Sequence, residues 1–370
     1  MEIFFKYSRR HSLIFTLVIL LVICLKAGIW YIPNIGATLA IALDPFTNPF
    51  QNNPMAHYLM YSWLGSFLAW LLGITTKNTF ILFHLFFTFC FFFSFVIFAY
   101  KNVSRDNFHK SLILFCLFPV SYTAFYWSGM DSITLFLLML CIIARSNIVA
   151  LFILGILLAL QHFEQALLAV VCLLGMSLFS SYEPINNLKF KRSSIFFLLI
   201  GLLAGKILLH GIFAYNNIEL NSGRIYYLLT EFWQFLAMFW YNGQVILWGI
   251  FGLGWLPVFV FHKMEKPGLI SYLIIFCCCL LSVISGDQTR VLAIVSFLYI
   301  STYIVLNDSF LDKLSSTFLS IVFCIWLLLP IVWVWGGVPR RSVLPFDITF
   351  LISLVRPVLS VPADPSAWPF

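Results

Sequence analysis

The chain alternates between long apolar stretches and short polar or basic connections. A transmembrane helix needs about 20 apolar residues, or fewer where side chains at its ends snorkel to the interface. Stretches of this kind cover residues 12–32, 80–100, 111–127, 131–145, 147–161, 164–180, 194–214, 243–262, 269–285, 289–306 and 316–335. The pattern predicts an all-α membrane protein, a polytopic helical bundle of about 11 transmembrane helices (10–12).

The aromatic stretch 55–73 (MAHYLMYSWLGSFLAWLLG) is too ambiguous to assign from length alone. Cytoplasmic loops are enriched in Lys and Arg, so the basic residues can decide. If 55–73 does not span, thirteen of the 21 Lys and Arg residues fall inside and six outside, with two in spans; if it spans, nine fall inside and ten outside. We therefore expect a first external loop, 33–79, that contains interfacial amphipathic helices.

Composition supports the membrane assignment and limits the partners. Hydrophobic residues make up 62% of the 370 residues, charged residues 9%, and the mean hydropathy is +1.00. The net charge of +7 would suggest nucleic acid in a soluble protein, but here it reflects orientation in the bilayer, so no nucleic-acid partner is expected. All nine cysteines fall in apolar stretches without zinc-site spacing.

Two regions follow from these features. Residues 1–335 form the expected transmembrane domain, and residues 336–370 form an external, proline-rich C-terminal tail. The basic N-terminus precedes an apolar stretch long enough to span, so we expect a retained first helix instead of a cleaved signal peptide. The predicted location is a bacterial inner (plasma) membrane, with a cytoplasmic N-terminus and an external, periplasmic active face.

Polar residues interrupt the apolar pattern at a few places on one face. His162 and Glu164 lie between two short predicted helices, where a turn costs less than burial of charge at mid-membrane. The same topology brings further acids from separate loops to the external face: Asp44, Asp131 in YWSGMDS, and Asp287 in SGDQTR. Sites in polytopic proteins form where several helix ends meet, so this convergence predicts a functional site.

Each of these residues also has a structural explanation. Asp44 could start a turn before Pro45. Asp131 could cap the helix that follows it, and Asp287 could cap the next one while pairing with Arg290. The polar residues of the predicted hairpin could simply satisfy a turn.

The order of segments resembles the GT-C membrane glycosyltransferases, most closely the protein O-mannosyltransferase and aminoarabinose-transferase branch. Three stretches carry the resemblance: NNPMAHYLMYSWLGSFLAWLLG, LILFCLFPVSYTAFYWSGMDSITLFLLMLCIIAR and ALFILGILLALQHFEQALLAVVCLL. It covers about residues 10–180 and rests on layout and short motifs. The resemblance implies a GT-C-like fold and transfer of a sugar from a polyprenyl-phosphate donor at the external leaflet.

The resemblance also implies a role for the first external loop. An Asp there is the general base that removes a proton from the acceptor hydroxyl, and by position this residue is Asp44. Two departures from the family pattern stand out: Asp44 precedes Pro45 where relatives often have an acidic pair, and Glu164 stands where relatives often have Lys. The second departure implies an altered contact to donor or acceptor.

The residue types suit this chemistry. Attack of a hydroxyl on the anomeric carbon needs a base near the hydroxyl and positive charge near the departing phosphate. Asp44 and Asp131 are the expected catalytic residues, with Asp131 orienting a substrate. The expected substrate-binding residues are His57, His162, Glu164, Arg224, Asp287, Arg290, Arg340 and Arg341, the arginines being suited to phosphate. No cofactor is certain, but Asp131, Glu164 and His162 could bind a divalent metal ion.

The expected partners are the bilayer, a polyprenyl-phosphate sugar donor and a lipid-linked glycan or surface polysaccharide acceptor. The aromatic stretch 224–244 could line a groove for the lipid tail or form an ordinary interfacial helix. A glycan polymerase and a non-enzymatic lipid or glycan transporter remain alternatives. A polymerase would use Arg residues in large external loops, and a transporter would favour mid-membrane charges and internal repeats.

Overall fold

The computed structural model describes residues 12–27, 35–126, 130–182, 184, 188–220, 223–335 and 338–341. The longer helices are α2 (Ser12–Ala27), α5 (Lys77–Asn102), α6 (Phe108–Leu117), α8 (Asp131–Ile143), α9 (Ile148–Phe179), α10 (Arg192–Tyr215), α11 (Gly223–Phe251), α12 (Trp255–Glu265), α13 (Leu269–Ile284), α14 (Gln288–Ile300) and α16 (Ser316–Leu328). The shorter elements are α3 (Ile35–Leu43), the 3₁₀-helix η1 (Pro54–Tyr61), α4 (Trp63–Leu71), α7 (Val120–Tyr126), the 3₁₀ turn η2 (Gly252–Gly254), the π-helical turn η3 (Ser301–Val305), α15 (Asp308–Lys313) and strands β1 (Val332–Trp335) and β2 (Val338–Arg341).

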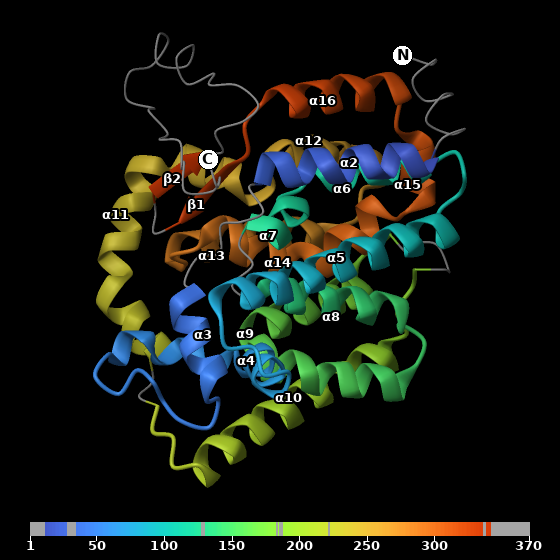
Figure 1. Cartoon of the computed structure of the whole chain (residues 1–370). Coiled ribbons are helices and arrows are strands. Elements are labelled where there is room, and N and C mark those ends of the chain that lie inside the picture. Colours follow the sequence, from blue (N-terminus) through green and yellow to red (C-terminus); the bar gives the residue numbers. More distant parts are fainter. Residues whose placement is uncertain are drawn as a thin grey trace.

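Most long helices lie side by side in a bundle, and α5, α14 and the buried α6 form part of its centre (Figure 1). Five helical stretches of the described residues are long and apolar enough to cross a membrane: α5, α9, α10, Leu229–Glu265 and Gln288–Val305. Apolar side chains on the outside of the bundle, such as Phe86, Phe196 and Ile207, are exposed. Such a surface is suited to lipid, and these features indicate a membrane protein.

Helix α9 is interrupted at His162, whose backbone is extended (φ −163°, ψ 77°). Its first half packs so tightly on α10 that a Cβ on Gly201 would lie 2.2 Å from the Phe152 carbonyl oxygen. Its second half ends beside the start of α10, where Met176 and Arg192 line one cavity. A straight helix rises about 1.5 Å per residue and would carry Met176 far past that point. The two halves therefore form a hairpin, as the sequence predicted.

The described part of the first loop, residues 35–76, contains short helices and no span. The stretch 55–73 divides into η1, which has eight residues, and α4, which has nine. Neither is long enough to cross the hydrocarbon core. This agrees with the expectation that 55–73 does not span, and it brings α4 onto the hairpin turn of α9.

The expected span 243–262 falls within the candidate span Leu229–Glu265, but it is not one straight helix, because the chain bends in the middle of it. Helix α11 ends at Phe251, Gly252 has a positive φ of +55°, and α12 begins at Trp255. Figure 1 shows α11 running across one end of the bundle, at a steep angle to the other helices. Trp233 and Trp240 on α11 are exposed, which fits the interfacial helix expected for 224–244.

The expected span 316–335 is wrong in its last part. Helix α16 ends at Leu328, and β1 then pairs antiparallel with β2, with Val332 opposite Arg341. The described residues are therefore mostly helical, as expected, with one short two-stranded ribbon that the sequence did not predict. The expected domain boundary between residues 335 and 336 falls inside this ribbon. A proline at 330 cannot continue a helix, which explains why the apolar pattern overestimates its length.

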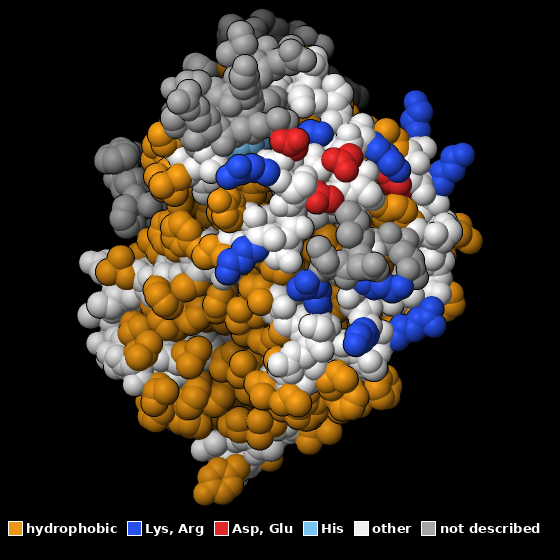
Figure 2. Space-filling view, turned by 90° about the vertical axis from the view of Figure 1, so that its right-hand side faces the viewer, with side chains coloured by type: hydrophobic (Ala, Val, Ile, Leu, Met, Phe, Trp, Pro, Cys, Tyr) orange, Lys and Arg blue, Asp and Glu red, His pale blue; other side chains and the backbone are white. Residues whose placement is uncertain are grey.

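The bundle has two distinct polar ends. The end formed by α3, α11 and the β ribbon lies opposite the end formed by α15 (Figure 1). Figure 2 looks onto the α15 end, where Lys and Arg side chains gather beside Asp and Glu. The exposed basic residues of this end are Lys101, Arg105, Lys189, Lys191, Arg192, Lys263, Lys266 and Lys313. The sequence assigned all of these to the cytoplasmic side, and that orientation stays a prediction.

Candidate functional site

Three charged side chains form a compact ion cluster at the end opposite α15. Arg290 donates from Nη1 to Asp131 Oδ2 at 2.8 Å and from Nη2 to Asp287 Oδ2 at 2.9 Å. The Asp131 side chain is 1% exposed, and those of Arg290 and Asp287 are about one fifth exposed. One guanidinium between two carboxylates leaves the cluster with a formal charge of −1. A buried carboxylate of this kind depends on its charged partner.

The helix starts position these carboxylates without using them as caps. Met130 adopts a left-handed conformation (φ 79°) at the N-cap of α8, and Asp131 follows as the first helical residue. Asp287 occupies the N-cap position of α14, but its side chain makes no capping hydrogen bond to a backbone N–H of that helix. Asp131 thus lies one residue after the N-cap of its helix, and the capping explanation is wrong for Asp287. The predicted pair between Asp287 and Arg290 is confirmed.

A chain of hydrogen bonds connects this cluster with the first loop. The indole Nε1 of Trp63 donates to the Pro45 carbonyl at 2.9 Å. Two residues later, the Gly65 N–H donates to Gln161 Oε1 at 2.9 Å, and Gln161 Nε2 donates to the Met130 carbonyl at 3.0 Å. Met130 is the neighbour of Asp131. Gln161 thus holds three segments together: α4, the hairpin turn of α9 and the start of α8.

Asp44 lies at the other end of this chain, beside Pro45. Its Oδ1 accepts the Phe46 N–H at 3.1 Å, and its carbonyl accepts the Thr47 N–H at 3.4 Å. These bonds confirm the predicted turn. The Asp44 side chain is exposed, in contrast to that of Asp131. Asp44 therefore presents a carboxylate to solvent on a turn that the buried hydrogen bonds hold in place.

The hairpin turn of α9 contains His162 and Glu164, which the sequence assigned to the candidate site. His162 is buried at the break in α9, and Glu164 pairs with Lys206 of α10 at 3.4 Å. Lys206 Nζ also lies 4.4 Å from the centre of the Tyr61 ring, within the range of a cation–π contact. With Asp131 bound to Arg290 and Glu164 to Lys206, the expected metal ligands face other partners. No group of three or more His, Cys, Asp or Glu among the described residues is arranged for a metal ion.

His57 lies in the wall of a cleft of about 430 Å³ between the first loop and the segment after α10. The buried His57 ring places Nε2 3.0 Å from the Phe50 carbonyl oxygen, to which it donates, and 3.3 Å from Asn48 Nδ2. Asn48 in turn donates to the Glu219 carbonyl at 3.3 Å. His57 therefore helps to build the cleft wall.

The side chains of Arg224, Arg340 and Arg341 lie outside the described residues, so only their backbones can be placed. Arg224 is in the first turn of α11, and Arg340 pairs with Trp333 in the β ribbon. The ribbon is attached to α14, because the Val334 N–H donates to Thr289 Oγ1 at 3.0 Å. Thr289 is adjacent to Arg290. The ribbon thus brings the Arg340-Arg341 backbone to the same end as the ion cluster.

Sequence reasoning missed three residues that matter at this end. Gln161 sits within an apolar stretch and shows no signal beyond its polarity, and Lys206 was assigned to a span. Gln288 is fully buried beside Asp287, and its amide atoms have no hydrogen-bond partner among the described residues. A buried amide in an apolar stretch is costly without partners, and that cost was the available signal for Gln161. Gln288 lies in the polar segment SGDQTR, where the sequence gives no sign that it is buried.

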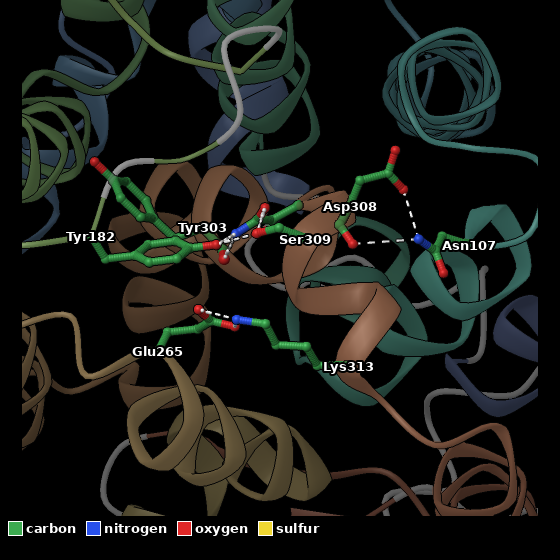
Figure 3. Close-up of polar contacts among 8 residues, drawn as sticks. Asn107, Tyr182, Glu265, Tyr303, Asp308, Ser309 and Lys313 are labelled. Carbon is green, nitrogen blue, oxygen red and sulfur yellow. Dashed lines mark hydrogen bonds and ion pairs between the residues drawn. The ribbon is translucent and has the colours of Figure 1, made fainter.

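The α15 end contains a second polar cluster, which Figure 3 shows. Asp308 accepts the Ser104 N–H at 2.9 Å and Asn107 Nδ2 at 2.8 Å. Asn307 Nδ2 donates to Tyr182 Oη at 2.6 Å, and Lys313 pairs with Glu265 at 2.8 Å. These bonds join the connections at this end to α15, and the carboxylates of Asp308 and Glu265 are occupied by donors from neighbouring segments. The α15 end is therefore a network that fastens connections, and the ion-cluster end is the better candidate for a functional site.

Comparison with known proteins adds no further assignment. No family model, no curated protein and no solved structure matches this chain.

Proposed function

We propose that this chain is a membrane glycosyltransferase that moves a sugar from a polyprenyl-phosphate donor to a hydroxyl of a glycan or glycolipid acceptor. The supporting observation is the hydrogen-bonded connection between the exposed Asp44 turn and the buried Asp131–Arg290–Asp287 cluster. An accessible carboxylate on a rigid support is what a general base requires.

The two catalytic candidates have different roles in this proposal. Asp44 is exposed, and among the described residues its side chain accepts one backbone N–H, on Oδ1. Oδ2 is the oxygen proposed to accept the proton. The Asp131 side chain is 1% exposed and bound at 2.8 Å to a guanidinium, so it does not present its carboxylate to an acceptor hydroxyl. Asp44 is therefore the proposed base, and Asp131 is a positioning residue that fixes Arg290.

The phosphate of the donor needs positive charge that the ion cluster does not supply by itself. Arg290 is already shared by two carboxylates, so the cluster has an excess of negative charge. The Arg340-Arg341 pair of β2 and Arg224 of α11 have backbones at the same end of the bundle. We assign phosphate binding to these three arginines, for which bidentate contact to phosphate oxygens is typical.

The reaction is a nucleophilic substitution at the anomeric carbon. The acceptor oxygen forms a bond to that carbon while its proton passes to Asp44. The bond from the anomeric carbon to the phosphate oxygen breaks, and the polyprenyl phosphate leaves with the electron pair. Cationic side chains near the departing phosphate stabilise the charge that develops on it.

The proposal also includes the finer architecture expected from the sequence. The enzyme would be GT-C-like with about 11 transmembrane helices and would act at the external face of a bacterial inner membrane. Exposed Trp233 and Trp240 on α11 support placement of the ion-cluster end at an interface. The acceptor is proposed to be a lipid-linked glycan or surface polysaccharide.

The direct test is sugar transfer by the purified full chain in lipid, with a panel of polyprenyl-phosphate sugars. One donor should be consumed, and Asp44→Asn should lower the rate about 10²- to 10⁴-fold, the usual contribution of a general base. Thermal unfolding should show the same midpoint for the variant, because Asn retains the oxygen that accepts the Phe46 N–H.

A matched control makes the same charge change at the opposite end. Asp106→Asn alters an exposed carboxylate of the α5–α6 connection and should keep full activity. Consumption of no donor would refute the proposed function. Full activity of Asp44→Asn would refute the assignment of the base.

A further inference from the structure

The cleft beside the Asp44 turn has a chemistry that the preceding assignments do not use. Its lining comes from two segments far apart in the chain: Phe46, Thr47, Asn48, Gln51 and His57 of the first loop, and Asn216, Asn217, Ile218 and Glu219 after α10. Its volume of about 430 Å³ is of the order expected for a small-ligand site. Amide groups dominate its polar lining.

The wall after α10 is preformed by a helix-ending motif. Asn217 adopts a left-handed conformation (φ 53°) directly after α10, a position that Gly or Asn commonly takes. The Ile218 N–H donates to the Phe213 carbonyl at 2.9 Å, and the Asn217 N–H donates to the Ala214 carbonyl at 3.2 Å. This is the hydrogen-bond pattern of a Schellman motif. Ile218 and Phe213, the two positions whose apolar side chains commonly accompany this motif, are both buried.

The opposite wall is tied to the first by Asn48. Its Oδ1 accepts the Phe50 N–H at 2.9 Å, and its Nδ2 donates across the cleft end to the Glu219 carbonyl at 3.3 Å. Asn48 therefore fixes the distance between the two walls. A pocket with fixed walls loses less conformational entropy when a ligand binds, which is the advantage of preorganisation.

The lining chemistry selects the class of ligand. Amides offer donors and acceptors together, Glu219 adds an acceptor, and Phe46 adds an aromatic ring. Among the described residues that line the cleft there is no Lys or Arg, so an anionic phosphate has no cation to bind. Many adjacent donors and acceptors beside an aromatic ring match a neutral sugar, whose hydroxyls both donate and accept. We propose that this cleft binds a neutral sugar unit of the acceptor.

The position of the cleft gives the sugar a role in transfer. Phe46 and Thr47 line the cleft and belong to the turn that begins at Asp44. A sugar in the cleft therefore lies beside the turn that carries the proposed base, while the proposed phosphate-binding arginines belong to other elements. This role rests on the proposed function, whereas binding of a sugar in the cleft can be measured without any turnover.

The test uses ligand-observed NMR on the full chain in lipid nanodiscs. The probes are methyl glucoside, methyl galactoside and methyl mannoside, with inorganic phosphate as the comparison. At least one glycoside should show saturation transfer, and phosphate should not compete with it. Gln51→Ala and Glu219→Gln change exposed lining residues and should weaken glycoside binding roughly 3- to 10-fold each, the value of a typical hydrogen bond.

The matched control is Asn53→Ala, which removes an exposed amide of the same loop outside the cleft and should leave binding unchanged. Glycoside binding that is absent, or insensitive to both lining variants, would overturn the inference. So would competition by phosphate at the same site.

The donor assay separates this inference from the proposed function. If the cleft variants weaken glycoside binding and no donor is consumed, the sugar site stands and the transferase is refuted. If a donor is consumed and the cleft variants change neither glycoside binding nor the KM for the acceptor, the transferase stands and the sugar site is refuted.

Discussion

The two ends of the bundle are both polar, but they use charge in different ways. At the α15 end, Asp308 accepts hydrogen bonds from Ser104 and Asn107, and Glu265 forms an ion pair with the exposed Lys313. At the other end, buried Asp131 shares Arg290 with Asp287, and an exposed acid lies nearby along the chain of hydrogen bonds. The hydrogen bonds of the first end join its loops to one another, whereas those of the second support a turn with an exposed carboxylate beside a cleft.

Buried charge alone does not distinguish the ends. Lys26 donates to the Trp326 carbonyl at 2.9 Å at the C-terminus of α16, and Lys110 donates to the Leu311 carbonyl at 2.7 Å in α15. Both lysines occupy positions where a cation is favourable, because the last carbonyls of a helix lack partners within it. The comparison therefore teaches that a site is recognised by accessible groups on a fixed support, more than by charge in an apolar chain.

The largest expected difference between the ends concerns their ion pairs. Arg290→Met removes the guanidinium that binds buried Asp131 and should destabilise the fold by about 3–5 kcal/mol. Lys313→Met breaks a pair in which the Lys313 side chain is 46% exposed and the Glu265 side chain only 4% exposed. It should cost about 1–3 kcal/mol, less than Arg290→Met, because water can replace a half-exposed ammonium group. Unfolding of the purified variants in detergent measures both values.

A double variant checks the cause of the Arg290 effect. Adding Asp131→Asn to Arg290→Met removes the buried negative charge as well, so it should recover part of the lost stability. Equal stability losses for Arg290→Met and Lys313→Met would show that the ion pair at the Asp131 end contributes no more to folding than the pair at the α15 end.

The next prediction compares the residues that fasten each end. Gln161→Leu removes two buried hydrogen bonds to backbone, and Asn107→Leu removes bonds to Asp308 and Asp312. Each should cost roughly 1–3 kcal/mol, measured by thermal unfolding. Below the unfolding temperature, only Gln161→Leu should also slow sugar transfer, because it supports the Asp44 turn. An equal loss of transfer in both variants would mean that the two ends contribute alike.

The smallest effect is the pH and salt dependence of the Lys313 pair. Its hydrogen bond to Glu265 raises the pKa of Lys313 above the ordinary value of 10.5. A raised folded-state pKa stabilises the fold fully below the unfolded pKa and loses this effect as pH rises through the folded value. The unfolding midpoints of wild type and Lys313→Met should therefore converge above pH 10.5, and also at 1 M salt, where screening is strong. A constant difference would contradict this account.

Parts of the candidate site could be predicted from sequence because they follow local rules. The hairpin at His162 follows from two apolar stretches separated by polar residues, and the pair between Asp287 and Arg290 follows from their spacing of three residues. The pairing of Asp131 with Arg290 could not be predicted, because it joins residues 159 positions apart. The same holds for Gln161, whose partners lie in two other segments.

Some helix ends could not be predicted from the hydrophobic pattern, because they also depend on contacts between distant segments. Hydrophobicity measures preference for an apolar environment and does not record where a helix ends. The break after Phe251 and the β ribbon after α16 both lie in apolar stretches that the pattern joined into spans. Packing of β1 on α11 and α14 buries Trp333 and Val334 outside any helix, which a pattern of single residues cannot show.

The sequence by itself determined that this is a mostly helical chain suited to a membrane, with an α9 hairpin, a first loop that does not span and polar residues gathered in loops. Those properties depend on the length and polarity of neighbouring residues. The tertiary structure decided which acid is buried, which is exposed and which loops share a cleft. Those properties depend on contacts between distant segments, and their energies arise only when the helices pack and exclude water from the groups between them.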